Sequence, residues 1–351
     1  MIERNIMRNT NGKWRWIIPI LLALSFIANI LGLLLPFLQI DEAFHANVIY
    51  SLPHSVALMW GHKLFLISIL ILVFSIIFPF FKLCSLVAVW FFPWKSKTRK
   101  KYLHGIELLG KWSFMDIFVV ILLLALTSKQ TNISSTIHSG VYFFIGAISL
   151  SMITSEIIMS LARKTYENET PQLHFINKRR WMVGQSIYIG WIVPLLAIAS
   201  GIALIESLNA TFLRISQLFL VSRSYSIHEI GILLWDQKLW VLFVVLVGTL
   251  FIIPVLRLVI LLFTLLVPMH ITNHLKFKKL ITVLSRWCML DVFGLALFLI
   301  TTEGKDLVKT QIQPGLYVVV FAIALSYGLG AIAIALDKVM IAKAIQQPEE
   351  T

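Results

Sequence analysis

The chain has 351 residues, of which 58% are hydrophobic and only 13% are charged, and its formal net charge is +13. Soluble globular domains are about 45–50% apolar and about 25% charged, so this composition excludes one. The positive charge would suit a nucleic-acid-binding protein, but the Lys and Arg residues gather between alternate apolar segments. That pattern is typical of a polytopic membrane protein, in which membrane orientation accounts for the charge, and we expect no nucleic-acid partner.

Eight apolar segments follow one another along the chain, most of them near the roughly 20 residues that a membrane-spanning helix needs. We therefore predict an all-α polytopic membrane protein with eight transmembrane helices. The third and seventh segments are short and would need tilt or local thinning of the bilayer. The first follows a basic N-terminus, as in a signal peptide, but no cleavage site follows it, so we expect a retained helix. The segments cover about 17–38, 64–92, 112–127, 141–160, 187–206, 239–267, 287–302 and 315–336.

The distribution of Lys and Arg predicts the orientation of these helices. Of the 30 basic residues, 21 lie in the N-terminal segment, in alternate connections and in the C-terminal tail, and 7 lie in the other connections. By the positive-inside rule, both termini are expected in the cytoplasm. The cytoplasmic parts would then include the basic N-terminus 1–16, the linker 162–186 and the tail 338–351.

The connection between the first and second spans of each half has a composition of its own. Residues 37–50 and 212–225 mix apolar, β-branched and polar residues without helix signals, which favours a small periplasmic β-hairpin in each half. Apolar residues then recur at helical spacing in 54–63 and 228–238, with a Trp near each end. This spacing favours amphipathic helices in the membrane interface, although a connecting turn of the next span would show it too.

A shift of 175 residues aligns the two halves of the chain without a gap, from Trp16 against Trp191 to Arg163 against Lys338. Each half holds four spans, so we predict two parallel four-helix repeats, 17–161 and 187–337, related by an axis along the membrane normal. Their interface is the expected place for a site. The Trp and Pro pairs in register are Trp16/Trp191, Trp60/Trp235, Trp112/Trp287, Pro19/Pro194, Pro79/Pro254 and Pro93/Pro268.

Charged residues interrupt the apolar spans at matching positions, with Lys82 and Asp116 in the first half and Arg257 and Asp291 in the second. A charge at the middle of a bilayer costs about 2.5–3.5 kcal/mol on insertion scales, so it persists only where it is paired, hydrated or used. Lys82 lies about 15 Å from the cytoplasmic end of its span and Asp116 about 7 Å, at 1.5 Å per residue. Because a lysine stem can extend towards the interface, we expect each cation to meet its carboxylate.

A proline lies three residues before each cation. Pro79 and Pro254 lack the amide hydrogen that would bond the carbonyl one turn earlier, at Ser75 and Leu250. Freed carbonyls inside a membrane need other partners or must line a wet cavity. We therefore expect a helix hinge and a polar site at both prolines.

Other side chains are assigned to these sites by position. The alternative to a functional polar site stays open: Lys82 and Arg257 would then only snorkel or form static ion pairs that hold helices together. His270 and His274 have i, i+4 spacing but no third ligand, so we expect no metal. With no Cys-x-x-Cys, phosphate-loop or nucleophile motif, we expect no cofactor and no enzyme activity. The polar network is extended by Lys111, Arg286, Thr127 and Thr302, and the interface aromatic residues are Trp112, Trp287, Trp60 and Trp235.

The segments FPFFKL and ELLGKWSFMDIFVVILLLAL, preceded by ALMW, carry a family resemblance. They resemble the membrane domain of the paraquat-inducible protein A family, whose pattern has Pro-x-x-Lys in one span and Gly-Arg-Trp-Ser-Met-x-Asp-Val-Phe opening the next. The resemblance covers both halves and is most specific in the first. In the second half the lysine is Arg257, and Gly-Lys-Trp-Ser is Ser-Arg-Trp-Cys.

This resemblance implies an inner-membrane component of a bacterial envelope lipid transport system. It would pass lipids between the inner membrane and a periplasmic partner with mammalian-cell-entry (MCE) domains. Separately, the absence of an ATP-binding motif leaves a proton gradient as the candidate energy source. Lys82, Asp116, Arg257 and Asp291 would form its polar networks. Family members carry cytoplasmic zinc ribbons with Cys-x-x-Cys pairs, which the short basic segments here lack. The alternative is a non-transporting scaffold or anchor for such a partner, or an envelope-stress component.

Overall fold

The computed structural model describes residues 12–42, 48–61, 63, 65–127, 133–169, 179–180, 187–217, 221–267, 269–303 and 310–346. Within them, eight helices are long and apolar enough to cross a membrane, which confirms the predicted all-α polytopic fold. The third and seventh candidates, Lys101–Ala125 and Lys276–Ile300, have 25 residues each. They are longer than their apolar segments because the basic helices before them continue the span.

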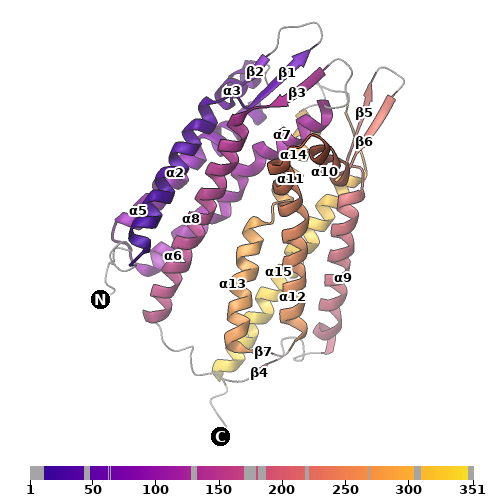
Figure 1. Ribbon diagram of the computed structural model, residues 1–351. Helices are drawn as coiled ribbons and strands as arrows, with labels where there is room; N and C mark the ends of the chain where they lie inside the picture. The colour runs from indigo at the N-terminus through magenta and orange to yellow at the C-terminus, as the bar shows by residue number, and fades with distance from the viewer. Residues whose placement is uncertain are drawn as a thin grey trace. The chain divides into compact units, whose positions relative to one another are not determined.

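The chain divides into two compact units (Figure 1), and each is described by itself. Unit 1 comprises Met1–Pro171 with Leu295–Asp306, and unit 2 comprises Gln172–Gly294 with Leu307–Thr351. The repeat boundaries 17–161 and 187–337 stay a prediction.

Helices make up most of unit 1, and three strands lie at one end of them (Figure 1). Its last helix continues past the apolar segment that ends near residue 160, because the Ala, Arg, Lys and Glu residues that follow are good helix formers. The elements are α2 (Trp14–Leu34), β1 (Leu38–Glu42), β2 (Val48–Tyr50), α3 (Leu52–Gly61), α4 (Phe65–Ile71), the π-helix η1 (Leu72–Ile77), α5 (Phe78–Phe91), α6 (Ser96–Gly110), the 3-10 helix η2 (Lys111–Phe114), α7 (Met115–Thr127), β3 (Ile133–Ile137) and α8 (Ser139–Glu169).

Among the described residues, unit 2 has the same order of α-helices, π-helix and sheet strands, with two additional short strands and without a counterpart of η2. Helix α14 begins in unit 2, and its last residues are grouped with unit 1. The elements are β4 (Arg179–Arg180), α9 (Ile187–Asn209), β5 (Leu213–Gln217), β6 (Val221–Tyr225), α10 (Ile227–Asp236), α11 (Trp240–Val247), the π-helix η5 (Gly248–Ile252), α12 (Ile253–Leu266), β7 (Met269–His270), α13 (Ile271–Trp287), α14 (Leu290–Glu303), β8 (Thr310–Ile312) and α15 (Gly315–Gln346).

A three-stranded antiparallel sheet lies at one end of each unit. In unit 1 the strand order is β2-β1-β3, and in unit 2 it is β6-β5-β8. Strands β1 and β2 pair Leu38 with Tyr50, and strands β5 and β6 pair Leu213 with Tyr225, so the register is the same after the shift of 175. The strand pairs β1–β2 and β5–β6 lie in the segments 37–50 and 212–225, where the sequence favours a hairpin. The third strand was not predicted, because 133–137 and 310–312 are too short and polar to show a strand pattern.

A glycine starts the last helix of each unit beside the sheet. The amide of Gly140 donates to the carbonyl of Pro36 at 2.9 Å, and that of Gly315 donates to Thr211 at 3.0 Å. A Cβ atom at Gly140 would stand 2.5 Å from the Pro36 oxygen, and one at Gly315 would overlap the Thr211 oxygen. Both positions therefore require a residue without a side chain.

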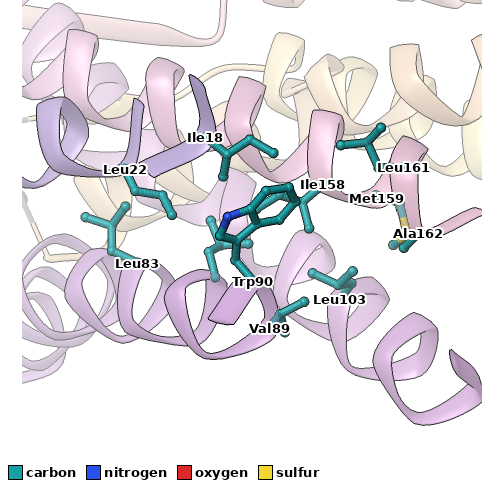
Figure 2. Close-up of a cluster of buried hydrophobic side chains, with 11 residues drawn as sticks. Ile18, Leu22, Leu83, Val89, Trp90, Leu103, Ile158, Met159, Leu161 and Ala162 are labelled. Atoms are coloured by element: carbon teal, nitrogen blue, oxygen red, sulfur yellow. The ribbon is translucent and has the colours of Figure 1, made fainter. Parts of the chain in front are cut away.

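Helices α2, α5, α6 and α8 of unit 1 meet in one hydrophobic cluster (Figure 2). Trp90 is fully buried at its centre, between Ile18 of α2 and Ile158 of α8. Nearer the sheet, helices α2 and α8 approach closely at Gly32, where an added Cβ would stand 3.0 Å from the backbone of Phe144. This packing holds α5, the helix that carries Lys82, against its neighbours.

The amphipathic segments form helices α3 and α10, and their position relative to a membrane stays a prediction. Helix α10 begins with a capping box, in which Ser226 and Glu229 bond each other's backbone amides. After each helix a lysine has left-handed backbone, Lys63 with φ 62° and Lys238 with φ 59°. This conformation favours Gly or Asn, so the same uncommon residue choice occurs in both units.

The close approach at Gly140 gives a stability prediction. Gly140→Ala is expected to lower the free energy of unfolding by about 1–3 kcal/mol, because the added methyl overlaps backbone that cannot move alone. The readout is the apparent Tm in detergent. Gly146→Ala on the same helix is the control, since a Cβ there meets no atom within 4 Å. An unchanged Tm for Gly140→Ala would contradict the packing described here.

Candidate functional site

The proline of each unit lies just after a π-helical turn. Helix η1 ends at Ile77 before Pro79, and helix η5 ends at Ile252 before Pro254. The amide of Phe78 bonds the carbonyl of Val73, and that of Ile253 bonds Gly248, so each bond spans five residues. The missing proline amide is thus accommodated by a wider turn. The expected hinge with a freed carbonyl stays a prediction, and π turns recur at functional positions.

The buried Lys82 and the half-buried Arg257 bond serines at equivalent positions. Lys82 Nζ donates to Ser151 Oγ at 3.1 Å, and Arg257 Nη1 donates to Ser326 Oγ at 2.9 Å. A second guanidinium nitrogen of Arg257 lies 3.5 Å from the Ser326 carbonyl oxygen. Lys82 is only 2% exposed. Each unit therefore holds its cation against its last helix, α8 or α15.

The expected ion pair between Lys82 and Asp116 is not formed. Both carboxylate oxygens of Asp116 lack a hydrogen-bond partner among the described residues, although the residue is only 4% exposed. The reason is the position of the cation: Lys82 Nζ lies 3.1 Å from where a Cβ of Gly110 would stand. Gly110 precedes Asp116 by six residues, which is about 9 Å along a helix.

Asp116 instead faces the π turn of its own unit. The Ser75 hydroxyl lies close enough to interact with its carboxyl group, but neither completes a hydrogen bond. The ring of Phe74, in the same turn, lies 6.1 Å from that of Trp112. The 3-10 helix η2, which leads into α7, therefore packs against η1. A costly buried polar group inside a membrane helix indicates a functional position.

Asp291 in unit 2 has hydrogen-bond partners. Its Oδ2 accepts from the hydroxyl of Tyr327 at 2.7 Å, and its Oδ1 accepts from the amide of Val292 at 3.0 Å. It lies in the first turn of α14, where unbonded amides and the helix dipole favour a negative charge. The helix break before α14 also contacts the π turn, because the Met289 amide donates to the Thr249 carbonyl at 3.4 Å.

A largely apolar pocket of about 40 Å³, with several polar side chains in its wall, lies inside unit 2. This volume has room for a few water molecules, since one needs roughly 10–15 Å³. Arg257, Asp291 and Tyr327 line it together with Pro254. The pocket thus collects the cation, the carboxylate and the proline that the sequence singled out in this half. The expected site between the two repeats stays a prediction.

A glycine makes room for each cation, on a different helix in each unit. A Cβ at Gly330 of α15 would stand 2.9 Å from Arg257 Nη2, whereas Gly110 of α6 gives the room in unit 1. The residues at the equivalent positions are Ser155 in unit 1 and Ser285 in unit 2. The larger guanidinium and the smaller ammonium therefore occupy differently shaped spaces.

The other predicted residues lie around these centres. Lys111 is buried, with its Nζ 6.0 Å from the ring centre of Trp112, and Arg286 and Trp287 are half-buried at the end of α13. Trp60 and Trp235 are 54% and 51% exposed. The side chains of Thr127, Thr302, His270 and His274 lie outside the described residues. Among those that are described, no three His, Cys, Asp or Glu residues converge as a metal site.

Sequence reasoning missed the hydrogen-bond partners of the charges. Ser151 and Ser326 bond the cations, and Tyr327 bonds Asp291. Ser75 lies near Asp116 without completing a hydrogen bond. The two serines are separated by the same 175 residues as the cations, so the repeat itself held a usable signal. The repeat gave no signal for Tyr327, because the equivalent residue in the first half is Met152.

Two comparisons with known proteins found a match to this chain. A family model described as paraquat-inducible protein A matches residues 16–162 and 192–335. A probable intermembrane transport protein of Haemophilus influenzae is 30% identical over 100 residues, which are 28% of this chain and 24% of that protein. The match thus spans about a quarter of the relative's length. No solved structure matches the chain.

The Lys82–Ser151 contact gives a prediction about coupling. In a double-mutant cycle of Lys82→Met and Ser151→Ala, we expect a coupling of about 1.5–3 kcal/mol, as for other hydrogen bonds to charged groups. Unfolding in SDS–detergent mixtures measures it. Lys82→Met with Ser155→Ala is the control pair, because the buried Ser155 hydroxyl has no hydrogen-bond partner among the described residues. Equal coupling in both cycles would contradict the assignment.

Proposed function

Because the chain belongs to the paraquat-inducible protein A family, we propose that it takes part in lipid transport across a bacterial envelope. It lies in the inner membrane with both termini in the cytoplasm, and it passes lipids between that membrane and a periplasmic protein with MCE domains. The name of the Haemophilus influenzae relative, a probable intermembrane transport protein, is consistent with this role. We propose no enzymatic activity for the chain.

The pocket in unit 2 is the observation that carries the proposal. Arg257 and Asp291 line one largely apolar pocket between apolar helices, beside a proline and a π turn. Keeping a charged side chain at that depth is costly, so such residues mark transport paths and relays in membrane proteins. The π turn supplies a place where the helix can change its hydrogen bonds at low cost. We therefore assign the charges to a switch that accompanies the movement of lipid.

A scaffold that only anchors a periplasmic partner is the second candidate. The bonds of Lys82 to Ser151 and of Arg257 to Ser326 favour it, because a static lock between helices would have the same contacts. The two candidates differ in what loss of the charges does. A lock would lose stability, whereas a switch would lose transport while the protein stays folded.

Transport measurements on charge variants separate these candidates. We expect Lys82→Ala, Asp116→Asn, Arg257→Ala and Asp291→Asn to lower the rate about tenfold, equivalent to about 1.4 kcal/mol in the barrier. The measurement is passage of a fluorescent phospholipid from vesicles carrying the chain to the purified MCE-domain partner. Cys84→Ser, at an exposed position, is the control. If all four variants insert stably and transport at the normal rate, the switch mechanism is wrong.

Energy coupling has its own test. No phosphate-loop motif is present in the sequence, so we propose that a proton gradient drives the movement of lipid. In the same vesicles, a protonophore should abolish net lipid passage, whereas ATP should have no effect on it. Net passage that continues at the same rate without a gradient would contradict proton coupling and leave the transport role itself in place.

A further inference from the structure

A second cavity lies in unit 1, away from the buried charges. It is an open groove of about 430 Å³ between helices α5 and α6. This volume is within the range of pockets that bind small molecules, roughly 300–1,000 Å³. Its lining is almost entirely apolar, and the residues that form it are Phe78, Phe81, Thr98, Lys101, Tyr102, Gly105 and Ile106.

The walls of the groove are held in place by other contacts. The hydroxyls of Tyr102 and Ser85 share a hydrogen bond of 3.0 Å, and the Tyr102 ring stacks on Trp94 at 5.1 Å. On the opposite wall, the rings of Phe78 and Phe81 lie 6.5 Å apart. The groove is therefore built from side chains that already have partners, so it does not need an occupant to form it.

The two ends of the groove differ in polarity. Thr98 and Lys101 are exposed near the start of α6, and Ile106 and Phe78 are buried at the other end. Thr98 and Ile106 are eight residues apart, about 12 Å along the helix. A long apolar channel that ends at a cation has the dimensions and polarity of an amphiphile with a negatively charged head.

The positive charge at the Lys101 end of the groove indicates which kind of amphiphile it would bind. Between residues 95 and 106 the sequence has five Lys or Arg residues and no Asp or Glu. By the positive-inside rule this end faces the cytoplasm, where anionic lipids attract such clusters. We propose that the groove binds one acyl chain of an anionic phospholipid from the cytoplasmic leaflet, with its phosphate beside Lys101. This inference goes beyond the proposed function, because it concerns binding and does not depend on transport.

Gly105 provides a specific way to close the groove. A Cβ at this position meets no atom within 4 Å, so a larger side chain would extend into open space without displacing the protein. Gly146 on helix α8 is equally open and lies outside the groove. Gly105→Leu and Gly146→Leu are thus a matched pair, in which only the first should exclude the acyl chain.

Photocrosslinking tests the proposal with the full chain in nanodiscs of equimolar phosphatidylglycerol and phosphatidylcholine. Phe81→p-benzoylphenylalanine places the probe in the groove, and the same replacement at Phe143, 41% exposed on α8, is the control probe. Lipid adducts are identified by mass spectrometry of the intact protein. We expect phosphatidylglycerol adducts to exceed phosphatidylcholine adducts about fivefold at position 81, the effect of one nearby cation, and to equal them at 143.

The variants then separate the possible outcomes. Lys101→Gln should remove the lipid preference at position 81, and Gly105→Leu should reduce the total adduct there at least about fivefold, while Gly146→Leu leaves it unchanged. Equal preference at positions 81 and 143 would overturn the proposal, because the groove would then be ordinary lipid-facing surface. A crosslink to a second copy of the chain in place of lipid would also overturn it. Neither result bears on transport.

Discussion

The site in each unit depends on one missing hydrogen-bond donor inside an apolar helix. A proline at 79 or 254 cannot complete the α-helical ladder, and no water is present in the hydrocarbon to replace the lost bond. The chain responds with a π turn before the proline. That wider turn contacts the segment just before the carboxylate helix, through Phe74 and Trp112 in unit 1 and through Thr249 and Met289 in unit 2. The cation three residues later then lies against the last helix of the unit.

On this shared backbone the two units carry different chemistry. Unit 1 buries Asn29, Ser75 and Asp116 without hydrogen-bond partners among the described residues. At the first two positions unit 2 has Leu204 and Leu250, which have no polar group to satisfy. Asp291, at the third, is bonded by Tyr327 and lines a pocket. The duplication has therefore kept the helix geometry and concentrated the unsatisfied polar groups in one unit.

The fold followed from composition because the membrane restricts the solutions so strongly. Twenty apolar residues can span only as a helix, and the third and seventh spans were underestimated because amphipathic helices such as α6 continue them. The prolines and the charges were recognised as special, but their partners were not. The depth estimate assumed that the Lys82 side chain extends to Asp116, but its ammonium lies beside Gly110 and bonds Ser151, so the two do not meet. The third strand of each sheet was too short for a pattern.

Each unit has a glycine beside its cation, but on a different helix, Gly110 in unit 1 and Gly330 in unit 2. This difference limits how the two units can diverge. An arginine needs the space that Gly330 gives it, whereas the equivalent position in unit 1 is Ser155. Changing Lys82 to arginine would therefore depend on an earlier loss of that serine side chain, and the reverse change would leave a gap beside Gly330. The order of substitutions is therefore constrained: from an ancestor with lysine in both halves, the glycine has to come before the arginine.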